Sequence, residues 1–171
     1  AEVARTYHRS PIIAERLHIR RTLPGMIQRS RGWIINITSG AAIGDISFTG
    51  AYTASKAALS QYSKILGGQL DRTGVTVFAY APGFVRTAMV EGVSNSQAVH
   101  SSIRNSFNEV IEGSADTPLE NCVNMFMVLA SGKADELSGR FVSVYDEDSD
   151  LPGQVEEIKQ NDLYTLRLHT E

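Results

Sequence analysis

Residues 36–56 read NITSGAAIGDISFTGAYTASK, and this stretch is the most informative part of the chain. Within it, Lys56 follows Tyr52 by four positions and Ser39 precedes Tyr52 by thirteen. A lysine one helical turn after a tyrosine lies on the same face of a helix. An ammonium group near a phenol favours the phenolate and lowers the tyrosine pKa from its reference value of about 10. The pattern therefore predicts that Tyr52 donates or accepts a proton near neutral pH, while Ser39 hydrogen-bonds the oxygen involved.

The sequence on both sides of this stretch predicts alternating strands and helices. Residues 33–38 form an almost continuous apolar run, typical of a parallel strand covered on both faces. Residues 75–80 predict a second strand and residues 139–145 a third. Apolar positions recur at helical spacing in residues 11–29 and 52–72. Such alternation with short connections predicts a parallel sheet with right-handed crossovers.

These elements together resemble the short-chain dehydrogenase/reductase family. Its signature is a serine at the end of one strand and Tyr-x-x-x-Lys opening the next helix. Members also carry Pro-Gly-x-Val-x-Thr after the following strand, matched here by Pro82, Gly83, Val85 and Thr87. The likeness spans residues 23–145. It implies an α/β fold, the C-terminal half of a Rossmann-like, doubly wound parallel sheet, with residues 1–171 as one truncated domain.

The resemblance also implies a function. Members are NAD(P)-dependent oxidoreductases that interconvert an alcohol and a ketone or aldehyde by hydride transfer, with a small-molecule substrate. Tyr52 would act as the general acid or base, Lys56 would assist it and bind the nicotinamide ribose, and Ser39 would orient the substrate oxygen. The residues expected to contact the cofactor are Tyr52, Lys56, Pro82, Gly83, Val85 and Thr87.

Two features of the family are missing from this sequence. The turn Gly-x-x-x-Gly-x-Gly, which places backbone N–H groups against the pyrophosphate, has no counterpart in the chain. The acidic or basic residue that would choose between NAD and NADP is absent with it, so this choice stays open. Many members also have a catalytic Asn about 27 residues before the serine, a position that falls near Pro11 and Ile12 here. The simplest interpretation of both departures is a truncated chain.

A second hypothesis belongs to a different class of function. The chain could be a non-catalytic interaction module that keeps half of the fold but not the chemistry. In the family, the helices matched by residues 11–29 and 52–72 commonly pack across a dimer interface, so a homo-oligomer is expected. Each site residue also has a structural alternative: Ser39 as a capping hydroxyl, Tyr52 as a core aromatic, Lys56 as a solvated helix residue, and Pro82-Gly83 as a turn.

Composition restricts the remaining classes. The chain is 42% hydrophobic and 20% charged, and no apolar run approaches the roughly 20 residues of a membrane span. The lone cysteine, Cys122, has apolar neighbours, which predicts a buried, inert thiol and a reducing compartment such as the cytoplasm. The four histidines have no metal-binding spacing, so we expect no metal site.

Charge is distributed unevenly along the chain. Residues 1–31 hold seven arginines and two glutamates, a net charge of +5. Residues 146–171 hold eight acidic and two basic residues, a net charge of −6. A basic start is compatible with a mitochondrial transit peptide or a nucleic-acid-binding arm. We favour a solvated helix face, because aromatic residues do not alternate with the arginines, and expect no nucleic-acid partner.

The region after the second strand is polar and less distinctive. Residues 88–117 suggest one helix around 97–111, and they form either a lid over the substrate, as in the family, or an ordinary surface connection. Residues 117–120 read TPLE, which predicts a helix start with Thr117 as the cap. Residues 154–163 predict a short terminal helix.

Overall fold

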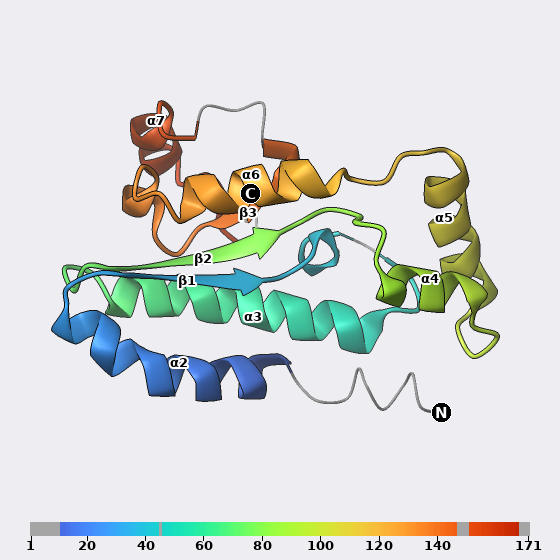
Figure 1. The fold of residues 1–171 in the computed structure, drawn as a ribbon, viewed down its shortest axis with the longest axis horizontal. Coiled ribbons are helices and arrows are strands. Elements are labelled where there is room, and N and C mark those ends of the chain that lie inside the picture. Colours follow the sequence, from blue (N-terminus) through green and yellow to red (C-terminus); the bar gives the residue numbers. More distant parts are fainter. Residues whose placement is uncertain (1–10, 45, 147–150, 168–171) are drawn as a thin grey trace.

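The computed structural model describes residues 11–44, 46–146 and 151–167 (Figure 1). Helices and strands alternate along the chain up to the second strand, and helices dominate after it. The elements are α2 (Pro11–Gln28), β1 (Gly32–Ile37), the 3₁₀ turn η1 (Gly40–Ala42), α3 (Gly50–Gln69), β2 (Val75–Ala81), α4 (Ala88–Asn95), α5 (Ser101–Glu112), α6 (Leu119–Leu129), η2 (Asp135–Leu137), β3 (Phe141–Ser143), η3 (Val144–Asp146) and α7 (Val155–Gln160).

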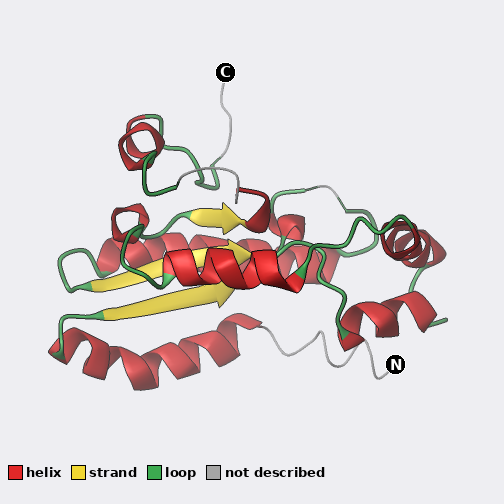
Figure 2. Ribbon diagram, turned by 45° about the horizontal axis from the view of Figure 1, so that its top comes forward, coloured by secondary structure: helices red, strands yellow, loops and turns green. Residues whose placement is uncertain are grey.

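The three strands form one parallel sheet in the order β1-β2-β3. Gly32 pairs with Val75 at the start of the β1–β2 register, and Ala79 pairs with Phe141 between β2 and β3. Helices α2 and α3 cover one face of the sheet and α6 covers the other (Figures 1 and 2). This arrangement confirms the expected α/β class and the parallel sheet.

Strand β2 lies at the centre and is buried along its whole length. Its side chains alternate between the two faces, as the pleat of a strand requires. Val75 and Val77 pack with residues of α2 and α3, whereas Phe78 and Tyr80 pack on the side of α6. Burial of an aliphatic or aromatic side chain contributes about 1.5–3 kcal/mol, so these two small cores hold the three layers together.

The third strand is shorter than the sequence predicted. Extended pairing is limited to Phe141–Ser143, and the backbone then turns into η3. The Asp146 carboxylate accepts a hydrogen bond from the Ser143 N–H at 2.7 Å. This local bond satisfies a donor that a longer strand would have paired, and it turns the chain away from the sheet.

One prediction for residues 88–120 was incomplete and another was wrong. The helix expected around 97–111 is α5, and a further helix, α4, precedes it because the Thr87 hydroxyl accepts a hydrogen bond from the Val90 N–H at 3.4 Å. Thr117 does not cap α6, whose N-cap is Pro118 and has no side-chain bond. The Thr117 hydroxyl instead accepts a hydrogen bond from the Phe84 N–H at 3.0 Å, a tertiary contact that takes the place of the cap.

Alanine substitutions at two adjacent glycines of α3, Gly67 and Gly68, are expected to change stability in opposite directions. A Cβ at Gly67 would lie 2.6 Å from the backbone nitrogen of Gly139, whereas a Cβ at Gly68 would have no neighbour within 4 Å. We expect Gly67→Ala to lower the free energy of unfolding by roughly 1–3 kcal/mol through overpacking. Gly68→Ala should raise it by up to about 1 kcal/mol. Urea unfolding of both variants measures the difference, and equal stabilities would contradict the close packing of α3 on Gly139.

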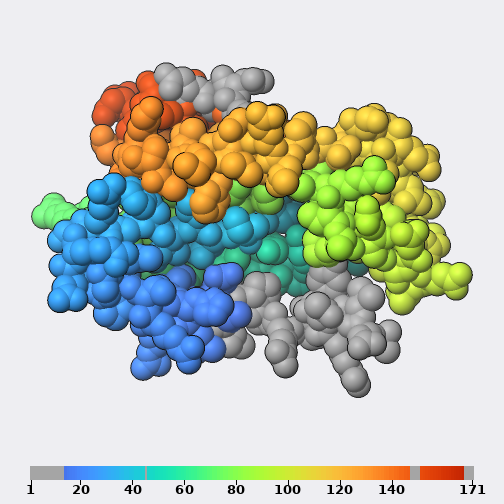
Figure 3. Space-filling model, viewed as in Figure 1, coloured from blue at the N-terminus to red at the C-terminus, as the bar shows by residue number. Residues whose placement is uncertain are grey.

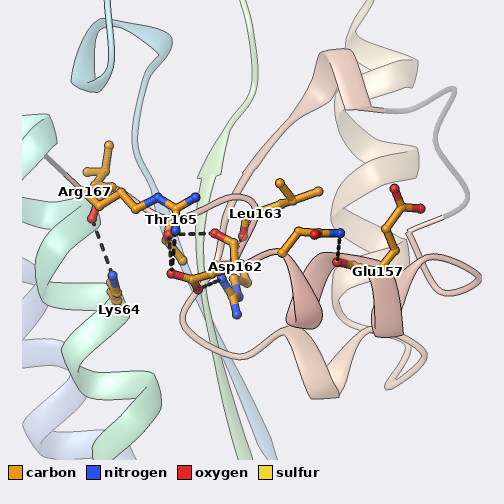
Figure 4. Close-up of polar contacts among 9 residues, drawn as sticks. Lys64, Glu157, Asp162, Leu163, Thr165 and Arg167 are labelled. Carbon is orange, nitrogen blue, oxygen red and sulfur yellow. Dashed lines mark hydrogen bonds and ion pairs between the residues drawn. The ribbon is translucent and has the colours of Figure 1, made fainter. Parts of the chain in front are cut away.

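The C-terminal segment is held by polar contacts around Asp162 (Figure 4). Arg140 donates a hydrogen bond to one carboxylate oxygen, and Arg167 pairs with the other at 3.3 Å. The Thr165 hydroxyl donates to the Asp162 carbonyl at 3.0 Å, and Arg140 also donates to the Leu163 carbonyl at 2.8 Å. These bonds attach the segment to the start of β3.

The Asp162 cluster predicts a dependence of stability on acid. The hydrogen bond from Arg140 holds the pKa of the Asp162 carboxyl below its ordinary value of 3.8. A lowered folded-state pKa stabilises the fold above the ordinary value, and this contribution is lost as the pH falls through the lowered one. Unfolding free energy should therefore fall more steeply below about pH 4 in the wild type than in Asp162→Asn. Parallel slopes for the two proteins in denaturant titrations would contradict this assignment.

Candidate functional site

A row of polar contacts joins the end of β1 to the middle of α3. Asn36 donates to the Ser63 hydroxyl at 2.9 Å, and the Thr38 and Ser60 hydroxyls are 2.8 Å apart. Asn36, Thr38, Ser60 and Ser63 are all buried, so each bond removes an unpaired polar group from the interior. We call these four residues the polar seam. It fixes α3 along its axis relative to β1 and so sets where Tyr52 and Lys56 lie.

Lys56 extends the polar seam at the carboxyl end of β1. Its Nζ donates to the Ile37 carbonyl at 2.9 Å and lies 5.8 Å from the centroid of the Tyr52 ring. Burial lowers the pKa of Lys56 from its ordinary value of 10.5, and the Glu15 carboxylate on α2 partly opposes this shift. The structure thus places a half-buried ammonium group beside Tyr52.

Ser39 follows Ile37 by two positions and lies in extended backbone, with φ of −159°. Its hydroxyl oxygen accepts a hydrogen bond from the Ala41 N–H at 3.2 Å and caps η1, as the structural alternative for this residue predicted. Accepting one bond leaves the hydroxyl hydrogen able to donate to another oxygen. The cap therefore orients Ser39 without removing its capacity to bind a substrate oxygen.

The segment Pro82–Thr87 continues from the carboxyl end of β2. Gly83 has φ of +76°, and a Cβ there would lie 2.3 Å from the Thr117 hydroxyl. Phe84 and Thr117 are joined twice, since the Thr117 N–H also donates to the Phe84 carbonyl at 2.8 Å. Val85 packs against the core on the α6 side. The contact with Thr117 and the positive φ therefore explain the glycine at position 83 without a contribution from a cofactor.

The sequence-predicted residues thus form two groups at one edge of the sheet. Lys56 contacts both the Tyr52 ring and the Ile37 carbonyl, and Ser39 follows Ile37 by two positions in the chain. The segment Pro82–Thr87 follows the adjacent strand, whose carboxyl end lies at the same edge because the strands are parallel. In open α/β sheets this edge is where ligands bind.

Sequence reasoning missed the polar seam. Lys56, Ser60 and Ser63 recur at positions i, i+4 and i+7, which places them on one helix face. That spacing could have indicated a polar stripe facing β1. Sequence alone did not show that Asn36 and Thr38 point toward this stripe, because both lie in a run that otherwise predicted an apolar strand.

The sequence also led to expectations about the cysteine, about metal binding and about membrane spans. Cys122 is buried, and its thiol donates to the Pro82 carbonyl at 3.0 Å. Within residues 11–44, 46–146 and 151–167, no three His, Cys, Asp or Glu side chains are grouped so that they could hold a metal ion. In the same part of the chain, none of the helices combines the length and the apolar character needed to cross a bilayer.

Comparison with known proteins agrees with this arrangement. Residues 15–98 match the sequence family described as short chain dehydrogenase. A protein assigned as the ketoacyl reductase of the monensin polyketide synthase of Streptomyces virginiae is 33% identical over 129 residues, covering 72% of this chain and 49% of that protein. The chain thus spans about half the length of this curated relative.

Solved structures give the same result. The KRED1-Pglu enzyme superposes with a TM-score of 0.70 at 26% identity, covering 82% of this chain and 58% of that one. A variant of the actinorhodin polyketide ketoreductase, crystallised with NADPH, has a TM-score of 0.58 at 26% identity, covering 70% of this chain and 48% of that one. With the sequence match and the parallel sheet, these likenesses show that the chain belongs to the short-chain dehydrogenase/reductase family.

Proposed function

We propose that the protein interconverts an alcohol and a ketone or aldehyde, using NAD or NADP, with Tyr52 as the acid or base. The observation that carries this proposal is the half-buried Lys56 ammonium, held by the Ile37 carbonyl and facing the Tyr52 ring at 5.8 Å. Relatives named as a ketoacyl reductase and as a ketoreductase crystallised with NADPH support the same chemistry.

Each residue of the site would have a separate role. Tyr52 would give its phenolic proton to the carbonyl oxygen during reduction and take it back during oxidation. Lys56 would stabilise the negative charge that develops on the phenol oxygen when the proton leaves. Ser39 would donate a hydrogen bond to the substrate oxygen and stabilise charge there. The nicotinamide cofactor would supply or accept the hydride.

The residues present fit one end of this cofactor. Lys56 offers three N–H donors, of which one is used by the Ile37 carbonyl, so it can also bind a ribose hydroxyl. Thr87 is the last residue of the segment that follows β2, and its hydroxyl lies at the start of α4. The glycine-rich turn that would hold the pyrophosphate is not in this sequence. The acidic or basic residue that would select NAD or NADP is also absent from this sequence, so the proposal names both cofactors.

An oligomer through α2 and α3 is a further part of the proposal. Leu17 and Ile65 are more than half exposed on these two helices, and Ile27 is 41% exposed, which supports a contact with a second copy. The alternative function, a non-catalytic interaction module, would use the same surface. A cytoplasmic location is also proposed, and the presence of a single, buried cysteine, Cys122, supports a reducing compartment.

Cofactor binding tests the proposal and separates it from the interaction module. We expect saturable binding of NADH or NADPH by the protein expressed from its complete coding sequence. Changes in protein fluorescence and in thermal stability would detect this binding. Lys56→Met, which removes the ribose donors, should weaken this binding, whereas Lys133→Met on a distant turn should not. Absence of binding at millimolar cofactor would contradict the enzymatic proposal and favour the interaction module.

A further inference from the structure

Phe48 has an unusual backbone conformation beside the candidate site. It lies four residues before Tyr52, and its φ is +64°, which bulky residues rarely adopt. Such conformations persist only where the surroundings hold them, and they cluster at functional sites. Thr49 holds this loop, because its hydroxyl donates to the Ile46 carbonyl at 2.7 Å and lies 2.9 Å from the Thr53 hydroxyl in the first turn of α3.

The Phe48 ring stacks on the imidazole of His100. The ring centroids are 3.8 Å apart and the planes differ by 11°. His100 is the N-cap of α5, and its Nδ1 accepts a hydrogen bond from the Ser102 N–H at 3.3 Å. This bond fixes the orientation of the imidazole that faces the ring. Residues 52 positions apart in the sequence thus connect the loop before Tyr52 to the start of α5.

Helices α4 and α5 lie beyond the carboxyl ends of β1 and β2, and α5 runs across the direction of α4 (Figures 1 and 2). Their residues gather at one end of the molecule (Figure 3). The turn between them is closed by Arg104, which donates to the Ser96 and Val99 carbonyls, both at 3.1 Å. An edge-to-face contact of Phe84 with Phe107, with centroids 4.8 Å apart, attaches α5 to the segment that follows β2. Helix α5 is therefore attached to both sides of the site by aromatic contacts, Phe84–Phe107 on one side and Phe48–His100 on the other.

Several large apolar side chains are exposed along this edge. The loop after β1 and the first turn of α4 expose large apolar side chains, between 49% and 65% accessible: Ile43, Ile46, Phe48 and Met89. Three charged groups near α4 already have partners: Arg86 and Glu91 pair with each other at 3.6 Å, and Arg104 donates to the Ser96 and Val99 carbonyls. Asp45 lies outside the described residues. Contact of an apolar ligand group with these apolar side chains removes apolar surface from water, which favours binding. The same side chains offer no hydrogen-bond partners to the hydroxyl groups of a sugar.

We propose that Phe48 and His100 form one wall of the substrate site, and that the site takes ketones or secondary alcohols carrying an aromatic or large aliphatic group rather than polyhydroxylated ones. The inference rests on the proposed function, because it assigns the substrate class of the same site. Phe48 and His100 determine specificity and do not take part in proton transfer. The stack on His100 restrains the Phe48 ring before the substrate binds, so this side chain would lose little freedom on binding.

Binding of two ketone probes tests this inference independently of turnover. Acetophenone carries an aromatic group, and dihydroxyacetone is small and polar. Ligand-observed NMR on the protein from the complete coding sequence should give tighter binding of acetophenone. Phe48→Ala and His100→Ala should each weaken acetophenone binding about three- to tenfold and leave dihydroxyacetone unchanged. Phe48→Trp should retain the binding, and Met127→Ala on α6 is the matched control for an exposed apolar side chain.

Two readouts make the outcome decisive. The C–H resonances of the His100 ring should shift in Phe48→Ala, because the ring current of the stacked phenyl is lost. Unchanged acetophenone binding in both alanine variants, or tighter binding of dihydroxyacetone by the wild type, would overturn the inference. Normal acetophenone selectivity in a protein that never reduces ketones would instead overturn the proposed function and leave the substrate wall intact. Phe48→Leu, which keeps apolar volume without an aromatic face, provides a folded variant if Phe48→Ala is unstable.

Discussion

Replacement of Tyr52 by Phe is expected to reduce ketone turnover by roughly 10²–10⁴-fold, the usual contribution of a positioned acid or base. The substitution removes only the hydroxyl group that transfers the proton. The aromatic ring stays, so the contact with the Lys56 ammonium at 5.8 Å from its centroid is preserved. NADPH affinity should therefore remain close to that of the wild type.

Tyr62 provides the matched control for this experiment. It lies on the same helix and packs against the core beneath the sheet. Tyr62→Phe makes the same chemical change ten positions away and should leave the turnover number unaffected. Steady-state kinetics of both variants, in the protein expressed from its complete coding sequence, separates proton transfer from any general effect on α3. Retained turnover in Tyr52→Phe would show that another group moves the proton.

Gly83→Ala is expected to give the largest loss of stability among single substitutions near the site. The added Cβ would lie 2.3 Å from the Thr117 hydroxyl and 2.8 Å from Cγ1 of Val144, and the backbone has φ of +76°. The left-handed conformation and the overpacking together should lower the free energy of unfolding by roughly 2–5 kcal/mol. Turnover should also fall, since the shift displaces the segment that follows β2.

Gly92→Ala is the matched control for Gly83→Ala. A Cβ at Gly92 would have no neighbour within 4 Å, and the residue lies inside α4. This variant should be unchanged or more stable by up to about 1 kcal/mol. Urea unfolding of the two variants gives the comparison. A Gly83→Ala protein as stable as Gly92→Ala would mean that the Pro82–Thr87 segment does not pack on Thr117 as described.

Much of the fold could be predicted from local patterns. The apolar run before Ser39 became β1, and the run at 75–80 became the fully buried β2. The helices expected at 11–29 and 52–72 are α2 and α3. Patterns of this kind are informative because burial acts on every residue of an element in the same way.

The errors came from contacts between distant segments. Thr117 followed by Pro118 has the sequence of a helix cap, but its hydroxyl bonds to Phe84, 33 positions earlier. The predicted end of β3 was too late in the sequence, because the Asp146 carboxylate accepts a hydrogen bond from the Ser143 N–H and the strand ends there. A local rule cannot decide which of two satisfactory partners a polar group will choose.

Spacing and family resemblance pointed to Ser39, Tyr52 and Lys56, and their roles stay predictions. The structure shows that the Lys56 ammonium binds the Ile37 carbonyl, two positions before Ser39. The polar seam and the Phe48–His100 stack carried no comparable signal. Both depend on the tertiary arrangement of side chains that, in sequence, are ordinary strand, loop and helix residues.

Transfer of deuterium from NADPH labelled at the nicotinamide C4 to an aryl ketone tests the central claim most directly. Mass spectrometry of the product would follow one label in two proteins, the wild type and Tyr52→Phe, both expressed from the complete coding sequence. We predict an alcohol that carries deuterium on its carbinol carbon with the wild type, and a loss of roughly 10²–10⁴-fold in its rate of formation with Tyr52→Phe. Unlabelled product, or equal rates for the two proteins, would contradict the assignment of this site to carbonyl reduction.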